Sequence, residues 1–200
     1  MKYESEKYYH IYNRGANKEE IFFFHENYRY CLRLLEKYAT KYKVVVLAYC
    51  LMPNHYHFML RQSLKGSVQR CIQTLFNSYT QALNKEQHRS GTLFEGRAKT
   101  REVDSDLYAV QLCAYIHLNP VAAQLVSKPN DWEFSDYNIW ISTDEPNKPC
   151  EGSNDLRKGK IFTDLSLRNL YFDDGETYKR FVEEQHRIKT DEKFECFLLD

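Results

Sequence analysis

Long apolar runs, glycine-rich phosphate loops and internal repeats are all lacking from this 200-residue sequence. Without an apolar run of about 20 residues no membrane-spanning helix is predicted, and no signal peptide pattern is visible. We therefore expect a cytoplasmic protein without a membrane partner. The absence of a glycine-rich loop removes the usual nucleotide-binding fingerprints. The length suits one domain with a real core plus an appendage.

Cysteine pairs with metal-ligand spacing are lacking too. The chain has six cysteines, but none of them forms a C-x-x-C pair. This pattern predicts neither a zinc site nor a disulfide framework, and it is typical of reduced thiols in a cytosolic protein.

Net charge is also absent, because 28 Lys and Arg residues balance 28 Asp and Glu residues. The balance is uneven along the chain: residues 1–140 hold 18 basic and 14 acidic residues, whereas residues 141–200 hold 10 and 14. This asymmetry indicates a basic working surface and an acidic tail. Sixteen tyrosines and twelve phenylalanines suit stacking on nucleic-acid bases, and they suit a packed core equally well.

The expected element order is β-α-β-β-α-β-α. Strands are predicted at 7–15, 43–52, 55–62 and 93–101, and helices at 25–42, at 67–87 and after Ser105. Pro53 and Asn54 should turn the second strand into the third as a hairpin. The order favours an α+β fold, a ferredoxin-like split βαβ sandwich with helices on one face of an antiparallel sheet. The other face, or a groove beside it, would then be free for a ligand.

Helix ends and faces can be predicted in part. Ser67 is a candidate N-cap of the second helix, and Ser105 or Asp104 of the third. The expected core side of the third helix consists of Leu107, Val110, Ala114 and Leu118.

A boundary near residue 128 divides an expected catalytic domain, 1–128, from a C-terminal extension, 129–200. The aromatic residues of 131–141 are numerous enough to dock this segment on the domain. Residues 143–160 are polar and rich in Pro, Gly, Asn and Asp, which predicts a loop or linker. A short helix is expected at 176–189.

Two histidines stand out in the third strand. His55 and His57 are two residues apart, so both imidazoles leave the strand on one face while Tyr56 points to the other. Two convergent imidazoles on a rigid strand make half of a metal site. The alternative is a pair of histidines on the solvated face of a sheet.

The third helix carries a candidate nucleophile. Tyr115 lies off the apolar stripe of that helix, and a tyrosine needs a base, a cation or a metal-polarised target to react, because its free pKa is about 10. Asn119 stands about one turn further on, where its amide oxygen can complete a metal site with His55 and His57. The alternatives are that Tyr115 is an ordinary amphipathic tyrosine and that Asn119 caps a new turn beginning at Pro120.

Four motifs in order resemble one family. HIYNRG near the start, HYH after MPN, LFEGRAKT before the third helix and CAYIHLNP within it are together similar to the HUH single-tyrosine transposases. The REP-associated tyrosine transposase (IS200-like) branch is the most similar, and the resemblance runs from about residue 8 to about residue 184. In that family two histidines separated by one hydrophobic residue bind a metal ion, and a tyrosine on a helix attacks DNA.

The resemblance implies a role for each matching residue. His55 and His57 would be metal ligands, Tyr115 the nucleophile and Asn119 the third ligand, with Gln111 as the fallback ligand. It implies Mg²⁺ or Mn²⁺ as the cofactor and a 5′-phosphotyrosine intermediate in cleavage of single-stranded DNA. The stretch NPVAAQLV departs from the basic residue and glycine that relatives often carry after NPV. This departure puts a DNA contact or a turn in question.

The implied partner is single-stranded DNA that folds into hairpins, bound by a monomer or a homodimer in the nucleoid. Basic residues are the candidate phosphate contacts. They are Arg14, Arg61, Arg70, Arg97, Lys99 and Arg101. Two other functions compete with DNA transesterification: a domesticated protein that binds hairpins without cleaving them, and a metal hydrolase that uses the two histidines plus a distant carboxylate.

Overall fold

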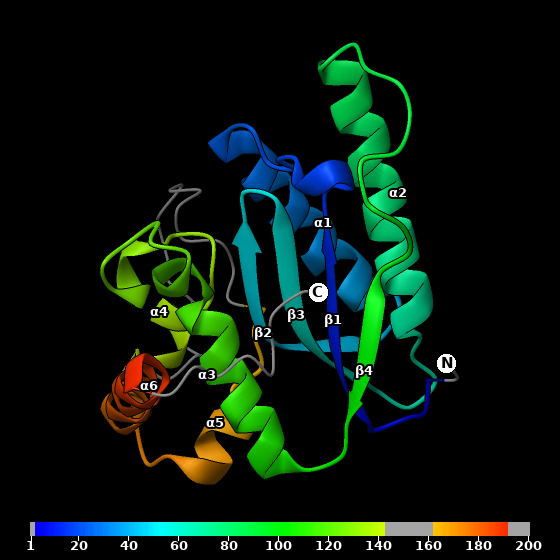
Figure 1. Ribbon diagram of the computed structural model, residues 1–200. Helices are drawn as coiled ribbons and strands as arrows, with labels where there is room; N and C mark the ends of the chain where they lie inside the picture. The colour runs from blue at the N-terminus through cyan, green and yellow to red at the C-terminus, as the bar shows by residue number, and fades with distance from the viewer. Residues whose placement is uncertain (1–2, 143–161, 192–200) are drawn as a thin grey trace, which may run out of the picture.

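The computed structural model describes residues 3–142 and 162–191 and shows four strands and six α-helices there (Figure 1). The strands are β1 (Tyr8–Arg14), β2 (Val44–Met52), β3 (His55–Gln62) and β4 (Lys99–Val103). The helices are α1 (His25–Lys41), α2 (Val68–Glu86), α3 (Asp106–Ala122), α4 (Tyr137–Trp140), α5 (Ser166–Tyr171) and α6 (Gly175–Asp191). Every element predicted from the sequence is present, with ends shifted by a few residues except in the last strand. That strand begins at Lys99 instead of residue 93.

The sheet is antiparallel throughout, with the strand order β2-β3-β1-β4. Pro53 and Asn54 form the two-residue turn of the β2–β3 hairpin, because Met52 pairs with His55. The first strand of the chain lies inside the sheet, between β3 and β4. The α+β sandwich predicted from the element order is confirmed.

One face of the sheet packs on α1 and α2 (Figure 1). Alternate residues of the strands point to this face, among them Tyr9, Ile11, Tyr56, Phe58 and Leu60, and each is fully buried. Apolar side chains of both helices complete this core, as the helical spacing in the sequence predicts. Ser67 caps α2 as expected, since its hydroxyl accepts a hydrogen bond from the Arg70 backbone N–H.

The opposite face is covered by α3 and the C-terminal helices, so the expectation of helices on one face and a free second face needs correction. Buried residues of β2 and β3 such as Leu47 and Met59 pack there against Cys113 and Ile116 of α3. The alternating pattern of the strands did not show this, because β2 is apolar on both of its faces.

The expected core side of α3 is also partly wrong. Ser105 is its N-cap, and Val110, Ala114 and Leu118 are buried, but Leu107 is 57% exposed. Further on, α3 lies between the sheet and α6 and is buried on nearly all sides. A helix enclosed in this way has no single apolar stripe.

The C-terminal extension packs on the domain. Trp140 is fully buried, and its indole N–H donates to the Leu47 carbonyl of β2 at 2.9 Å. The indole of Trp132 donates to the Leu51 carbonyl at 3.0 Å, so the predicted docking of 131–141 is confirmed. The helix expected at 176–189 is α6. The linker predicted at 143–160 lies outside the described residues. Each helix that the structure describes is too short or too polar to span a bilayer.

Candidate active site

The two histidines of β3 meet Tyr115 of α3 on the second face of the sheet. His55 begins β3 directly after the hairpin turn, and His57 follows two residues later on the same face. Their ring centroids are 5.2 Å apart, and the centroids of His57 and Tyr115 are 5.8 Å apart, with the rings edge to face. The fold thus brings together residues that are about sixty positions apart in the sequence.

The orientation of His55 follows from its neighbour Asn54. The distance between His55 Nδ1 and Asn54 Oδ1 is 2.6 Å. An amide oxygen only accepts hydrogen bonds, so Nδ1 carries the proton and Nε2 keeps a lone pair. A neutral imidazole with one nitrogen held by a second residue is the usual state of a histidine that binds a metal ion.

His57 is held by a residue that the sequence analysis did not identify, His10 of β1. His10 Nε2 and His57 Nδ1 are 3.0 Å apart, and both side chains are buried. The remaining nitrogen of His57, Nε2, is buried and has no hydrogen-bond partner among the described residues. When His57 Nδ1 donates to His10, this Nε2 presents a lone pair with no protein donor, as a metal ligand must.

Burial keeps these imidazoles neutral. It lowers the pKa of His10 to about 3, with the nearby positive charge of Arg101 acting in the same direction. It lowers the pKa of His55 to about 4 and brings the pKa of His57 well below its usual range, where His10 and His55 lower it further. Neutral imidazole is the form that coordinates metal ions, so no proton competes for the site near neutral pH.

Asn119 lies inside α3 and caps no new helix, so the capping alternative is wrong: α3 continues through Pro120 to Ala122. Its amide nitrogen donates to the carbonyl of Tyr115 at 2.9 Å and to that of Ile116 at 3.4 Å. Pro120 has no N–H for the Ile116 carbonyl, and the Asn119 side chain replaces that missing donor.

Asn119 also lies close to His55 and Tyr115. A hydrogen bond with its side chain raises the pKa of His55, which burial lowers, and lowers the pKa of Tyr115, which burial raises. Asn119 therefore lies within hydrogen-bonding reach of both residues. An unprotonated imidazole nitrogen of His55 and an amide oxygen of Asn119 are both groups that can bind a cation.

Tyr115 is partly buried beside His57 and Asn119. Burial raises its pKa to about 12, so the hydroxyl keeps its proton until a substrate or cation enters. Among the described residues no group of three or more His, Cys, Asp or Glu side chains is placed to hold a metal ion. Within the described residues, His55, His57 and Asn119 fit a cation as two imidazoles plus an amide. Gln111, the fallback ligand, is exposed one turn before Tyr115.

Four of the six predicted DNA-contacting cations point to the same face of the sheet as the histidines, two of them already in salt bridges. Arg14 binds Glu95 through two hydrogen bonds, at 2.5 and 2.9 Å, and Arg61 is paired with Glu6. Lys99 and Arg101 are exposed on β4, opposite Tyr12 and His10 of β1.

The other two cations lie elsewhere. Arg70 is exposed on α2, and Arg97 precedes β4 on the side of the sheet that faces α2. Residues 93–101 predict a strand that would place Arg97, Lys99 and Arg101 on one face, but this prediction is wrong for Arg97, because β4 begins only at Lys99.

Comparison with known proteins identifies a family and a similar fold. Residues 4–119 match the family model described as "Transposase IS200 like". The fold is similar to a REP-associated tyrosine transposase solved with a REP hairpin, at 15% identity and a TM-score of 0.62, over 84% of this chain and 93% of that one. A putative transposase from Deinococcus radiodurans matches at 18% identity and a TM-score of 0.41, over 58% and 95% of the two chains. No curated protein matches.

Proposed function

Since the chain belongs to the IS200-like transposase family, as the match over residues 4–119 shows, we propose that it cuts and rejoins single-stranded DNA through Tyr115. The observation that carries the proposal is the convergence of Tyr115 with His55 and with His57, whose buried Nε2 has no hydrogen-bond partner among the described residues. A hairpin binder without chemistry has no use for a lone pair buried without a partner, since such a group costs folding free energy.

The reaction is an in-line displacement at phosphorus. The Tyr115 hydroxyl oxygen forms a bond to the phosphorus and loses its proton, while the bond from phosphorus to the 3′ oxygen breaks and that oxygen is protonated. The product is a 5′-phosphotyrosine, and the bond energy is kept for rejoining without ATP. Alignment of the hydroxyl with the phosphate provides much of the rate enhancement in a displacement of this kind.

The cofactor would be held by His55, His57 and Asn119. A bound Mg²⁺ or Mn²⁺ would supply Lewis-acid stabilisation of the charge on the scissile phosphate. His10 and Asn54 act as positioning residues, because each fixes the orientation and tautomer of one imidazole. Asn119 links Tyr115 to the same centre, so the nucleophile and the phosphate are oriented by one group of side chains.

The substrate we propose is single-stranded DNA beside a hairpin. The similar transposase was solved with a REP hairpin, and the family match extends the likeness from the fold to DNA processing. Lys99 and Arg101 would hold phosphates on the edge strand β4, on the same face as Tyr115.

The test is formation of a covalent adduct. Labelled single-stranded DNA carrying hairpins from around the gene is incubated with the protein and Mn²⁺, and denaturing gels reveal any protein–DNA adduct. We expect an adduct that Tyr115→Phe, His55→Ala and EDTA each abolish. Tyr108→Phe, on the same helix but two turns away, is the matched control and should keep the adduct.

Two other results would change the conclusion. Hairpin binding with neither adduct nor cleavage would indicate the domesticated binder. Cleavage that survives Tyr115→Phe would mean that water is the nucleophile, and the proposed mechanism would be wrong.

A further inference from the structure

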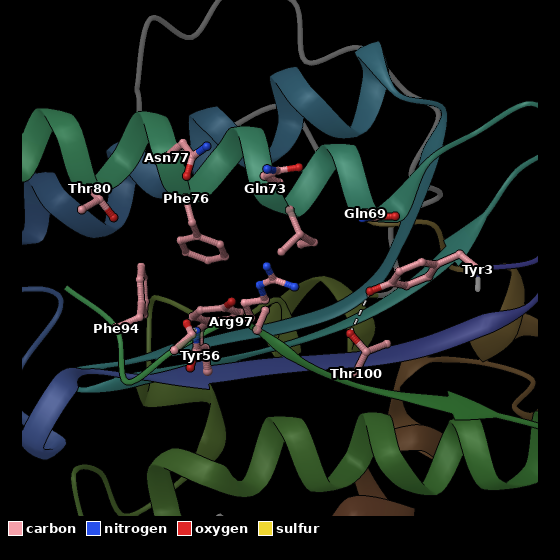
Figure 2. Close-up of a pocket in the computed structure, with 14 residues that line it drawn as sticks. Tyr3, Tyr56, Gln69, Gln73, Phe76, Asn77, Thr80, Phe94, Arg97 and Thr100 are labelled. Atoms are coloured by element: carbon pink, nitrogen blue, oxygen red, sulfur yellow. Dashed lines mark hydrogen bonds between the residues drawn. The ribbon is translucent and has the colours of Figure 1, made fainter. Parts of the chain in front are cut away.

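A cavity of about 630 Å³ lies on the face of the sheet away from Tyr115, between α2 and the chain leading into β4 (Figure 2). Tyr56, the residue between the two histidines, lines it from β3. Tyr3 closes one end through a hydrogen bond of 2.8 Å between its hydroxyl and that of Thr100. The proposed chemistry uses none of these residues.

One wall of the cavity is a row of carboxamides. Gln69, Gln73 and Asn77 follow each other at four-residue intervals, so they lie along one side of α2 (Figure 2). None of the three makes a hydrogen bond with the part of the chain that the structure describes, and all three are exposed. Each offers both a donor and an acceptor to whatever enters.

The apolar side of the cavity is aromatic. The rings of Phe76 on α2 and Phe94 pack edge to face with their centroids 5.0 Å apart, and the Phe76 ring stacks on that of Tyr56 with a centroid distance of 4.2 Å. The Tyr56 hydroxyl is fully buried and has no partner among the described residues. A buried hydroxyl without a partner is rare in native structures and costs free energy, so it points to a missing polar ligand.

The only charge among the lining residues is positive. Arg97 is exposed, and Figure 2 shows its guanidinium directed towards α2 across the cavity. A polar, aromatic cavity with one guanidinium fits a ligand that combines a flat ring, hydrogen-bonding edges and one negative charge. A nucleotide has all three.

We propose that this cavity binds an unpaired base of the DNA substrate, with its phosphate on Arg97. A carboxamide pairs with adenine through two hydrogen bonds, so adenine is the base we expect it to bind best. The inference rests on the proposed function, because it takes the ligand to be the same DNA. It adds a second contact on the opposite face of the sheet from the reacting phosphate.

The path between the two sites follows from the position of β4. This strand is the edge of the sheet, with Arg97 preceding it on the cavity side and Lys99 and Arg101 exposed on the face of Tyr115. A single strand can therefore pass around the edge of the sheet and contact cations on both sides. The cavity and the catalytic face would hold two parts of one substrate.

The test uses 2-aminopurine, a fluorescent analogue of adenine, placed in turn at each unpaired position beside the hairpin. The protein carries Tyr115→Phe so that the DNA stays intact. We expect one position to be quenched on binding by stacking on the aromatic rings. The double variant Gln73→Ala/Asn77→Ala should lose this quenching and weaken binding of that DNA by about tenfold.

The matched control is Gln81→Ala, an exposed glutamine of α2 that does not line the cavity. It should leave both quenching and affinity unchanged, and thermal melting should show that each variant is folded. Equal quenching and affinity in the double variant would overturn the proposal. The two proposals can be contradicted separately. If the wild type forms the adduct but the double substitution changes neither quenching nor affinity, only the proposed base-binding cavity is wrong. If quenching is specific to one position but the wild type forms no adduct, only the proposed chemistry is wrong.

Discussion

His10 shows how a single side chain can orient the histidine that we propose as a metal ligand. The distance between His10 Nε2 and His57 Nδ1 is 3.0 Å, which makes one hydrogen bond. Replacing His10 by Phe should keep the buried volume filled but release His57 from its orientation. We expect Mn²⁺ affinity to fall by about 10- to 100-fold, measured by isothermal titration calorimetry.

The control for that change is His88→Phe, at an exposed histidine after α2. It should bind Mn²⁺ as the wild type does. Unchanged affinity in the His10 variant would show that His57 is oriented by packing alone.

The buried histidines also make stability depend on pH when EDTA removes metal ions. The folded-state pKa of His10 is about 3 and that of His57 is well below its usual range, whereas both are about 6.5 in the unfolded chain. Between these values the unfolded state binds more protons, so the free energy of unfolding should fall as pH drops below about 6.5, by roughly 1.4 kcal/mol per pH unit for each histidine.

Urea denaturation at pH 7, 6 and 5 measures this slope. The variant His10→Phe should show a shallower decline than the wild type, because one neutral imidazole has been removed. A wild-type slope of zero over this range would contradict the neutral, buried state of the pair.

Much of the candidate active site could be predicted from the sequence, residue by residue. His55 and His57 were evident from strand alternation, and Tyr115 from its position in the motif. His10 was not, although it lies in the HIYNRG motif, because alternation places a residue on a face without giving the strand register. Only the pairing of β1 with β3 brings His10 beside His57. Asn119 before Pro120 resembled a cap, because a short sequence does not show that the Asn119 amide replaces the donor missing from Pro120.

At the scale of elements, α3 is fixed to the rest of the protein by a buried polar network. His117 donates from Nε2 to Asp136 at 2.9 Å, and its Nδ1 is 2.7 Å from the Tyr178 hydroxyl of α6. Asp136 also accepts from the Tyr49 backbone N–H and from the Thr163 hydroxyl. The helix that carries Tyr115 is therefore hydrogen-bonded directly to Asp136 and to α6, and Asp136 connects it to Tyr49 of β2 and to Thr163.

Tyr178→Phe removes one of these bonds and leaves the Nδ1 of a buried histidine without a partner. We expect the free energy of unfolding to fall by about 1–3 kcal/mol, measured by urea denaturation. Tyr171→Phe, at a tyrosine that is 42% exposed, is the matched control and should change stability by less than about 0.5 kcal/mol. Equal stability of the two variants would mean that water replaces the lost bond.

The strands and helices could be predicted from local sequence patterns, but the way in which they pack in layers could not. Alternating residues, a proline turn and serine caps were enough to find the strands and helices. The covering of the second face by α3 and α6 depends on contacts between segments far apart, such as His117 and Tyr178. No local period records such contacts, and Leu107 was assigned to the core for that reason.

At the scale of the whole molecule, the cations that point to the face of Tyr115 should differ in their contribution to binding. Lys99 and Arg101 are exposed on β4, whereas Arg14 is held by Glu95. The double variant Lys99→Gln/Arg101→Gln should reduce the slope of log affinity against log salt concentration for single-stranded DNA by about 1.4. Fluorescence anisotropy at several salt concentrations measures this slope.

The comparison variant is Arg14→Gln/Glu95→Gln, which removes an ion pair without changing net charge. Its slope should equal that of the wild type. A larger loss there than in the Lys99/Arg101 variant would place the DNA path beside β1 and away from the edge strand.

The position of β1 inside the sheet determines when the sheet can form during synthesis of the chain. Its residues are synthesised before those of both neighbouring strands, because Tyr8 pairs with Arg61 and with Val103, and the second pairing requires nearly a hundred further residues. Such distant pairings slow folding. The sheet can be completed only after β4 has been synthesised, and α6, which holds the helix of Tyr115 in place, follows later in the chain. Tyr115 therefore reaches its final environment only after the α6 segment has been synthesised.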